Sequence, residues 1–138
     1  MTSNFEKVQA FMRKFKIVDE WKRDGEPHLL DDKSFLFRYH LIAEETHELL
    51  KAHRKGDIVE MADALADLLY VVYGMADLSA IPIDAVFAEV HRANMTKVRS
   101  RGDDDPLGKR NSKLDVVKPA GFKPPDVAKV LKLVHSDG

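Results

Sequence analysis

The residues best suited to chemistry in this chain of 138 residues are acidic, and they fall in two neighbouring segments. LIAEETHELL (41–50) holds Glu44, Glu45 and Glu48, while the segment that follows Gly56 holds Glu60, Asp63 and Asp67. Hard divalent cations take oxygen ligands, and Mg²⁺ typically binds a few carboxylates together with substrate phosphates. The pattern therefore predicts a site for Mg²⁺, with Mn²⁺ as the possible substitute, that handles a phosphorylated substrate.

The acids also share faces of the helices that would carry them. At about 100° of rotation per residue, Glu45 and Glu48 fall on the same side as apolar neighbours, and Glu60, Asp63 and Asp67 form one stripe. No Lys or Arg occurs between Gly56 and His91. Two carboxylates about 4 Å apart repel by about 4 kcal/mol at an effective dielectric near 20, so facing acids need protonation or a cation. The alternative is a solvated acidic face.

Five helices are expected to position these residues, because the apolar residues recur with helical period and no long run alternates apolar with polar side chains. The first helix is expected around Phe5–Phe15, with Thr2, Ser3 or Asn4 as its cap, and the second runs from Asp31–Ser34 to Gly56. The third begins after the cap Asp57 and ends at about Leu78. The fourth runs from about Asp84 to Val98, and a short last helix begins at Pro124. The prediction is an all-α protein, a four- to five-helix bundle. We expect a single domain in which 1–98 is the bundle with the acidic site and 99–138 is an extended arm with a short helix.

Composition removes several classes of function. The chain has no cysteine, which excludes disulfides, thiol nucleophiles and thiolate metal sites, and its formal net charge is -1. The longest uncharged apolar run, Leu68–Ala76, is about half a membrane span. The N-terminus lacks the apolar core of a secretory signal. We therefore expect a cytoplasmic protein that binds neither nucleic acid nor membranes.

Three segments together, AEETHELL (43–50), ADALADLLYVVYG (62–74) and AVFAEVHRANMTK (85–97), resemble the MazG-like branch of the all-α nucleoside triphosphate pyrophosphohydrolases. The tail KPAGFKPPDVAKVL (118–131) is also similar to that branch. The resemblance implies Mg²⁺-dependent cleavage of an NTP or dNTP to the monophosphate and pyrophosphate. It also implies assembly as a homodimer or a dimer of dimers, and for some members a preference for dUTP.

The resemblance assigns metal ligands with one departure. The family's first motif, Glu-Glu-x-x-Glu, matches Glu44, Glu45 and Glu48. Its second, Glu-x-x-Asp, matches Asp67, but Ala64 stands at the glutamate position. Asp63 is the favoured replacement and Glu60 the second choice. In this assignment Glu45, Glu48, Asp67 and one of these two hold the metal, and Glu44 is the general base.

Substrate contacts are expected from the fourth helix. By resemblance Asn94 and Lys97 bind the phosphates or sugar of the nucleotide, and Arg92 begins a positive cluster suited to a triphosphate. The alternative for Arg92 is a cation that stabilises the C-terminal end of the helix dipole. Tyr70 lies on the acidic stripe and is a further candidate for the substrate, its alternative being a core tyrosine.

Competing functions stay open at this point. A di-iron carboxylate site needs two Glu-x-x-His motifs, whereas this chain has one, Glu44–His47. A helical module that binds nucleotide or a partner without catalysis, and a pyrophosphohydrolase for another substrate such as phosphoribosyl-ATP, both fit the acidic groove. Apolar surface on the third and fourth helices exceeds what one small bundle covers, which favours a homodimer. We expect the arm to reach a neighbouring active site, the alternative being a mobile tail.

Overall fold

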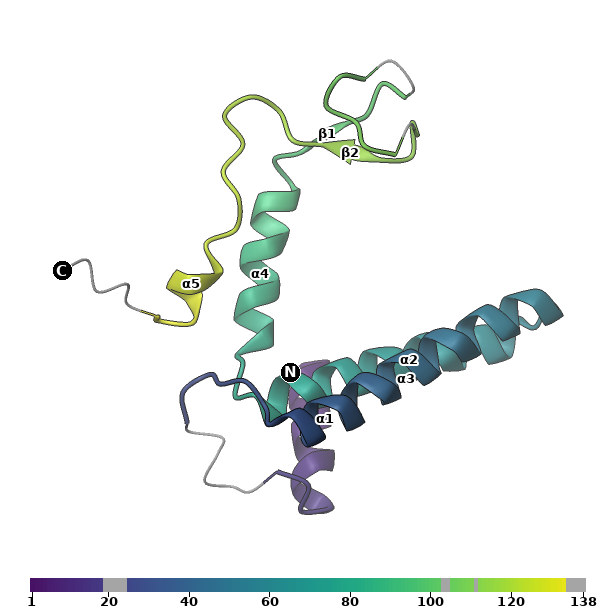
Figure 1. Cartoon of the computed structure of the whole chain (residues 1–138), viewed down its shortest axis with the longest axis vertical. Helices are drawn as coiled ribbons and strands as arrows, with labels where there is room; N and C mark the ends of the chain where they lie inside the picture. Colours follow the sequence, from purple (N-terminus) through teal and green to yellow (C-terminus); the bar gives the residue numbers. More distant parts are fainter. Residues whose placement is uncertain (19–24, 103–104, 111, 134–138) are drawn as a thin grey trace. The chain divides into compact units, whose positions relative to one another are not determined.

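Helices dominate the computed structural model, which describes residues 1–18, 25–102, 105–110 and 112–133. The elements are α1 (Asn4–Lys14), α2 (Asp32–Lys55), α3 (Ile58–Leu78), α4 (Ile83–Asn94), β1 (Val98–Arg99), β2 (Val116–Val117) and α5 (Val127–Val130) (Figure 1). They fall into two compact units, Met1–Ile83 and Asp84–Gly138. The all-α prediction is confirmed.

The first helix is fixed at its start by Ser3. The Ser3 hydroxyl accepts the Glu6 backbone N–H at 3.1 Å, and the Glu6 carboxylate accepts the Ser3 N–H at 3.1 Å. Val8 and Met12 lie on the buried face of α1 and form a core cluster with Val18, against which Tyr73 and Leu78 of α3 pack. This cluster joins α1 to the rest of the first unit.

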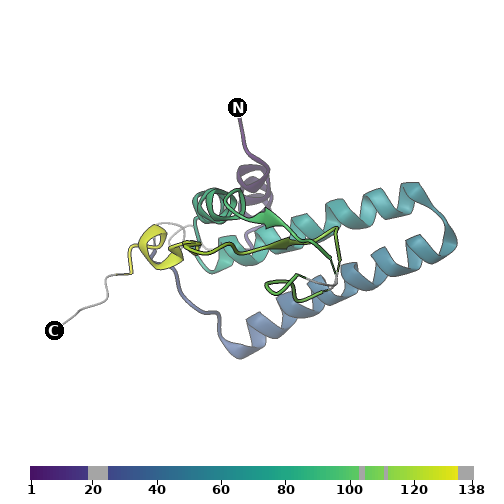
Figure 2. The ribbon, with the colours of Figure 1, turned by 90° about the horizontal axis from the view of Figure 1, so that it is seen from above.

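The second and third helices form a hairpin with a very short turn. Asp31 caps α2 through the Ser34 N–H, Gly56 ends α2 with φ 71°, and Asp57 caps α3 through the N–H groups of Val59 and Glu60. A left-handed residue followed at once by a cap reverses the chain, so α2 and α3 lie side by side and antiparallel (Figures 1 and 2). The predicted bounds of both helices are confirmed.

Several buried positions of α2 and α3 carry small residues. Ala52, Ala64, Gly74 and Ala76 are all buried, while larger apolar residues of α3 such as Leu65 and Leu69 are 44% and 54% exposed. In the single chain, α3 therefore leaves part of its apolar surface exposed. Gly74 meets Arg38 of α2, whereas Leu65 and Leu69 stay on the outside of the single chain.

The second unit departs from the expected pattern at the end of α4. We predicted a helix to Val98, but α4 ends at Asn94, because Val98 and Arg99 pair antiparallel with Val117 and Val116. The arm thus contains a minimal hairpin that the sequence pattern did not indicate. Its terminal helix α5 has only four residues and is capped by Asp126.

The terminal segment is tied to α4 by one carboxylate. Glu89 accepts the Asp126 backbone N–H at 3.1 Å and pairs with Arg92 at 2.8 Å. The Arg92 hydrogen bonds, followed by that from Asp126, lower the pKa of Glu89 to about 2. Glu89 therefore stays ionised and holds α5 near α4.

Within the described ranges, no helix alone combines the length and apolar character needed to cross a membrane, and α3 with α4 meets that test only when the two are counted together across their break.

Candidate metal and nucleotide site

Glu45 of α2 lies within electrostatic range of acids on both α2 and α3. Partial burial raises the pKa of Glu45, and the negative charges of Asp67, Glu44, Glu48 and Asp63 raise it further, in that order. The strongest charge effect comes from Asp67, on the opposite helix. Asp67 and Asp63 on α3 thus act on Glu45 across the α2–α3 contact, and the role of these acids as metal ligands stays a prediction.

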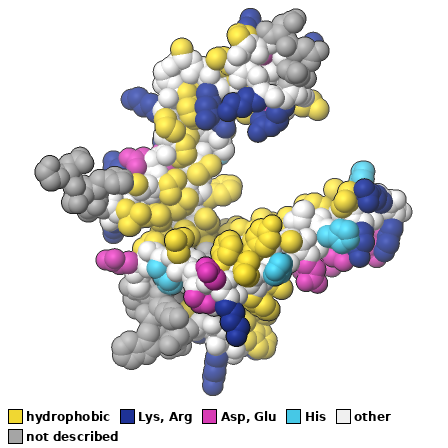
Figure 3. Space-filling model, viewed as in Figure 1, with side chains coloured by type: hydrophobic (Ala, Val, Ile, Leu, Met, Phe, Trp, Pro, Cys, Tyr) yellow, Lys and Arg dark blue, Asp and Glu magenta, His cyan; other side chains and the backbone are white. Residues whose placement is uncertain are grey.

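Two of the predicted ligands have cationic neighbours that the sequence argument did not take into account. Glu48 pairs with Lys51 at 2.9 Å, and Glu60 pairs with Lys55 at 3.3 Å. The hydrogen bond from Lys51 lowers the pKa of Glu48. Both pairs are exposed, and such pairs contribute about 0–1 kcal/mol, so they do not prevent these carboxylates from turning to a stronger cation. In Figure 3 acidic side chains follow one edge of the hairpin and Lys and Arg gather at its turn.

The donor set suits a hard divalent cation, although its members are not gathered into a formed cage. In the part of the chain that the structure describes, no three His, Asp or Glu residues lie close enough to hold a metal ion. All the acids around Glu45 offer oxygen, however, and their mutual repulsion is the condition that a divalent cation relieves. Ala64, at the family's glutamate position, is buried at 4% exposure and adds no oxygen.

Tyr70 contacts α1. Its ring meets that of Phe11 edge-on, with centroids 5.2 Å apart and planes at 87°, and the residue is 41% exposed. This packing favours the structural alternative for Tyr70, and its role as a substrate contact stays a prediction.

The predicted phosphate-binding residues lie in the second unit. Arg92 is engaged by Glu89, as described above, which favours its structural alternative. Asn94 is exposed at the end of α4, and Lys97 follows it with a backbone hydrogen bond of 3.1 Å to the Asn94 carbonyl. Further basic residues gather over the β1–β2 hairpin (Figure 3), where Arg99 donates to the Lys113 carbonyl at 2.9 Å. The role of Asn94 and Lys97 in binding an anion stays a prediction.

One buried charged residue was missed by the sequence analysis. Arg38, on α2, is 8% exposed and packs against Gly74 of α3. The available signal was an arginine inside the apolar run FLFRYHLI (35–42), two helical turns before Glu45 on the same face.

Comparison with known proteins gives two findings. The model of the phosphoribosyl-ATP pyrophosphohydrolase family (PRA-PH) matches residues 8–94, more than half of the chain. The chain is also 33% identical over 92 residues to an uncharacterised protein of Acanthamoeba polyphaga mimivirus. That match covers 59% of this chain and 33% of the viral protein, so the chain spans about a third of that relative.

Proposed function

We propose a function from the premise that this chain belongs to the phosphoribosyl-ATP pyrophosphohydrolase family, which is part of the MazG-like all-α superfamily. Members of the family are pyrophosphohydrolases that act on phosphoanhydride bonds, and the superfamily is generally dependent on divalent metals. The proposed activity is Mg²⁺-dependent hydrolysis of a (d)NTP to the monophosphate and pyrophosphate. The observation that carries it is that acids of both α2 and α3 raise the pKa of Glu45, with Asp67 of α3 the strongest charge among them.

In the proposed mechanism the acids have two roles, metal ligand and general base. Glu45, Glu48 and Asp67, with Asp63 ahead of Glu60, would hold the metal. A bound divalent cation supplies polarisation of the phosphates and a lower pKa for a coordinated water. Glu44, exposed beside Glu45, accepts the proton of the attacking water.

Bond changes follow from the proposed products. The water oxygen forms a bond to the α-phosphorus, the bond from that phosphorus to the bridging oxygen breaks, and pyrophosphate leaves. Asn94 and Lys97, by resemblance to the family, bind the phosphates or sugar. Positioning and charge neutralisation supply most of the rate, as in other phosphoryl transfers.

A substrate panel tests this proposal. We expect Mg²⁺-dependent release of pyrophosphate and monophosphate in equal amounts from one or more of the common NTPs and dNTPs, and no release in EDTA. The relative rates, dUTP included, give the base and sugar preference. Phosphoribosyl-ATP belongs in the panel because the family carries its name. Turnover of that compound alone would replace the proposed substrate, and no release from any compound would favour a binding module without catalysis.

We also propose that the protein is a homodimer or a dimer of dimers. Leu65, Leu69 and Val72 of α3 are 44%, 54% and 39% exposed. At about 100° per residue they form one stripe, which lies on the side of α3 away from Asp63 and Asp67. An apolar stripe opposite the acids suits a second copy, because pairing there leaves the acidic face open.

Replacing Leu69 by lysine tests that assembly. We expect the wild-type protein to sediment as a dimer or tetramer and Leu69→Lys to shift toward the monomer, because a buried unpaired ammonium is costly. Leu114→Lys is the matched control, since Leu114 is 91% exposed in the second unit. A wild-type protein that sediments as a monomer at all concentrations would contradict the proposal.

A further inference from the structure

Arg38 is a buried cation with no counter-charge among the residues that the structure describes. It is 8% exposed, and among the described residues it makes no ion pair. Its polar contact is weak, 3.8 Å from Nη2 to the sulfur of Met12, and the Phe37 ring lies 6.0 Å from its guanidinium carbon. Burial lowers the pKa of Arg38. A guanidinium has five N–H donors, and leaving them unsatisfied in the interior is costly, so this arrangement calls for a ligand.

The opposite helix makes room for this guanidinium. Gly74 of α3 is buried, and a Cβ added there would lie 3.0 Å from Nη1 of Arg38 and 3.7 Å from the Met12 sulfur. Glycine inside a helix costs about 0.5–1 kcal/mol relative to alanine. The glycine therefore gives space to the Arg38 head group at the expense of helix stability.

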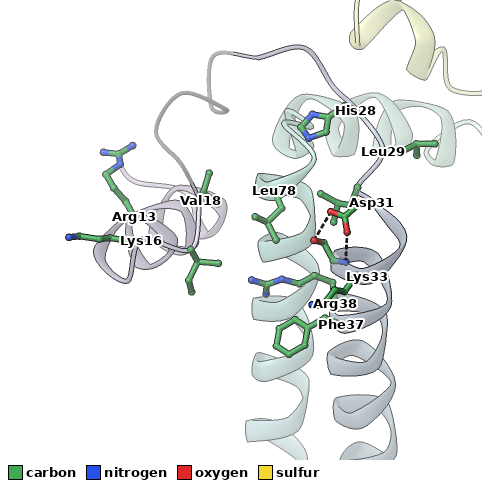
Figure 4. A pocket seen from close by; sticks show the side chains of 13 residues that line it. Arg13, Lys16, Val18, His28, Leu29, Asp31, Lys33, Phe37, Arg38 and Leu78 are labelled. Carbon is green, nitrogen blue, oxygen red and sulfur yellow. Dashed lines mark hydrogen bonds between the residues drawn. The ribbon is translucent and has the colours of Figure 1, made fainter.

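Arg38 points into a pocket of the first unit. The pocket has a volume of about 1230 Å³ and lies between the end of α1, the segment before α2 and the start of α2. Figure 4 shows the Arg38 guanidinium extending from α2 toward α1, while the heads of Arg13 and Lys16 point away. The one acid among the lining residues, Asp31, is occupied by hydrogen bonds from Ser34 of 3.0 Å and 2.7 Å. Among its described lining residues, the pocket thus offers a buried cation and no free carboxylate.

We propose that Arg38 and this pocket form a subsite that binds a phosphate group of the substrate. An arginine fork matches phosphate oxygens through two parallel hydrogen bonds, and a phosphate supplies the missing counter-charge. The apolar lining, including Ile17, Phe37 and Leu78, suits the organic part of the same ligand. The identity of the ligand as substrate rests on the proposed function.

The position of Arg38 relative to the acids supports a shared ligand. Arg38 precedes Glu45 by seven residues on α2, and Gly74 follows Asp67 by seven on α3. Both intervals are two helical turns, or roughly 10 Å, along one side of each helix. The cation and the acids therefore lie along the same α2–α3 contact, so one extended nucleotide can reach both.

Metal-free binding of small phosphates tests the subsite. In EDTA, isothermal titration calorimetry would follow pyrophosphate, which represents the polyphosphate chain, and ribose 5-phosphate, which represents a separate phosphate. We expect at least one to bind the wild-type protein and to lose tenfold or more in affinity in Arg38→Met, because charge-assisted hydrogen bonds disappear. The anion that binds identifies which phosphate of the substrate is taken.

Two further variants make the result decisive. Arg13→Met removes an arginine of the same pocket whose head points away, and should bind like the wild type. Gly74→Ala keeps Arg38 but places a methyl group against Nη1, and should weaken binding severalfold even if Arg38→Met fails to fold. Equal affinity in the wild type, Gly74→Ala and Arg38→Met, or no binding of either anion, would overturn the subsite. Arg38-dependent binding without turnover of any nucleotide would instead reject the proposed function alone.

Discussion

Glu45→Gln should abolish most turnover and at the same time stabilise the metal-free protein. Glutamine has the same shape but offers no negative charge to a divalent cation, and it stands where the acids of both helices converge. Loss of a group that stabilises developing charge typically lowers kcat by about 10²–10³. Pyrophosphate release at saturating Mg²⁺ measures this effect, and a Mg²⁺ titration separates weaker metal binding from slower chemistry.

The stability effect has a defined sign with pH. Because burial and the neighbouring acids raise the pKa of Glu45, the folded protein holds this proton more tightly than the unfolded chain does. The resulting contribution to stability is present below the ordinary pKa of 4.5 and is lost as the pH rises through the raised pKa. Near pH 7 the metal-free wild type therefore carries a repulsion that Glu45→Gln lacks. The Tm of the wild type in EDTA should be lower than the Tm of Glu45→Gln at about pH 7, and this difference should shrink in acid.

Glu26→Gln is the control for both effects, since Glu26 is exposed in the segment before α2. It should change neither turnover nor Tm. If Glu45→Gln kept full metal-dependent activity, Glu45 would not be a metal ligand. If it lowered Tm in EDTA at neutral pH, the carboxylates would be stabilised by partners rather than repelling one another.

The helices around the site could be predicted from local signals. Ser3, Asp31 and Asp57 cap their helices as expected, and Gly56 ends α2 in the left-handed conformation. These features depend on neighbouring residues, which a sequence displays directly. The family resemblance is confirmed as well, because its motifs have fixed spacing along the chain.

Features that depend on contacts between distant segments could not be read in this way. The pairing of Val98 with Val117, which replaces the expected last turn of α4, joins residues far apart in the chain. The same is true of Arg38, because its guanidinium packs against Gly74 on another helix. Lys51 and Lys55 precede the stretch without Lys or Arg that begins at Gly56. Lys51 pairs with Glu48 within α2, whereas Lys55 reaches Glu60 across the turn.

Met12→Ala should destabilise the protein. Met12 is 1% exposed and belongs, with Val8 and Val18, to the cluster that joins α1 to α3. Met-to-Ala truncation in a core costs about 2–5 kcal/mol through lost burial and a new cavity. We expect a loss near the lower end of this range, about 2 kcal/mol, because Met12 also lines a small pocket with Arg38 and is therefore not packed on every side. Urea unfolding followed by circular dichroism should show a lower midpoint.

Met95→Ala supplies the same chemical change at a residue that is 71% exposed, and should alter the free energy of unfolding by less than about 0.5 kcal/mol. The comparison isolates burial, since both variants lose the same atoms. Small domains are stable by only about 5–15 kcal/mol, so the Met12 variant should also expose α1 to proteases more readily than the Met95 variant. Equal midpoints for the two variants would mean that α1 does not pack on α3 through Met12. The pocket proposed to bind phosphate would then lack the wall that the end of α1 forms.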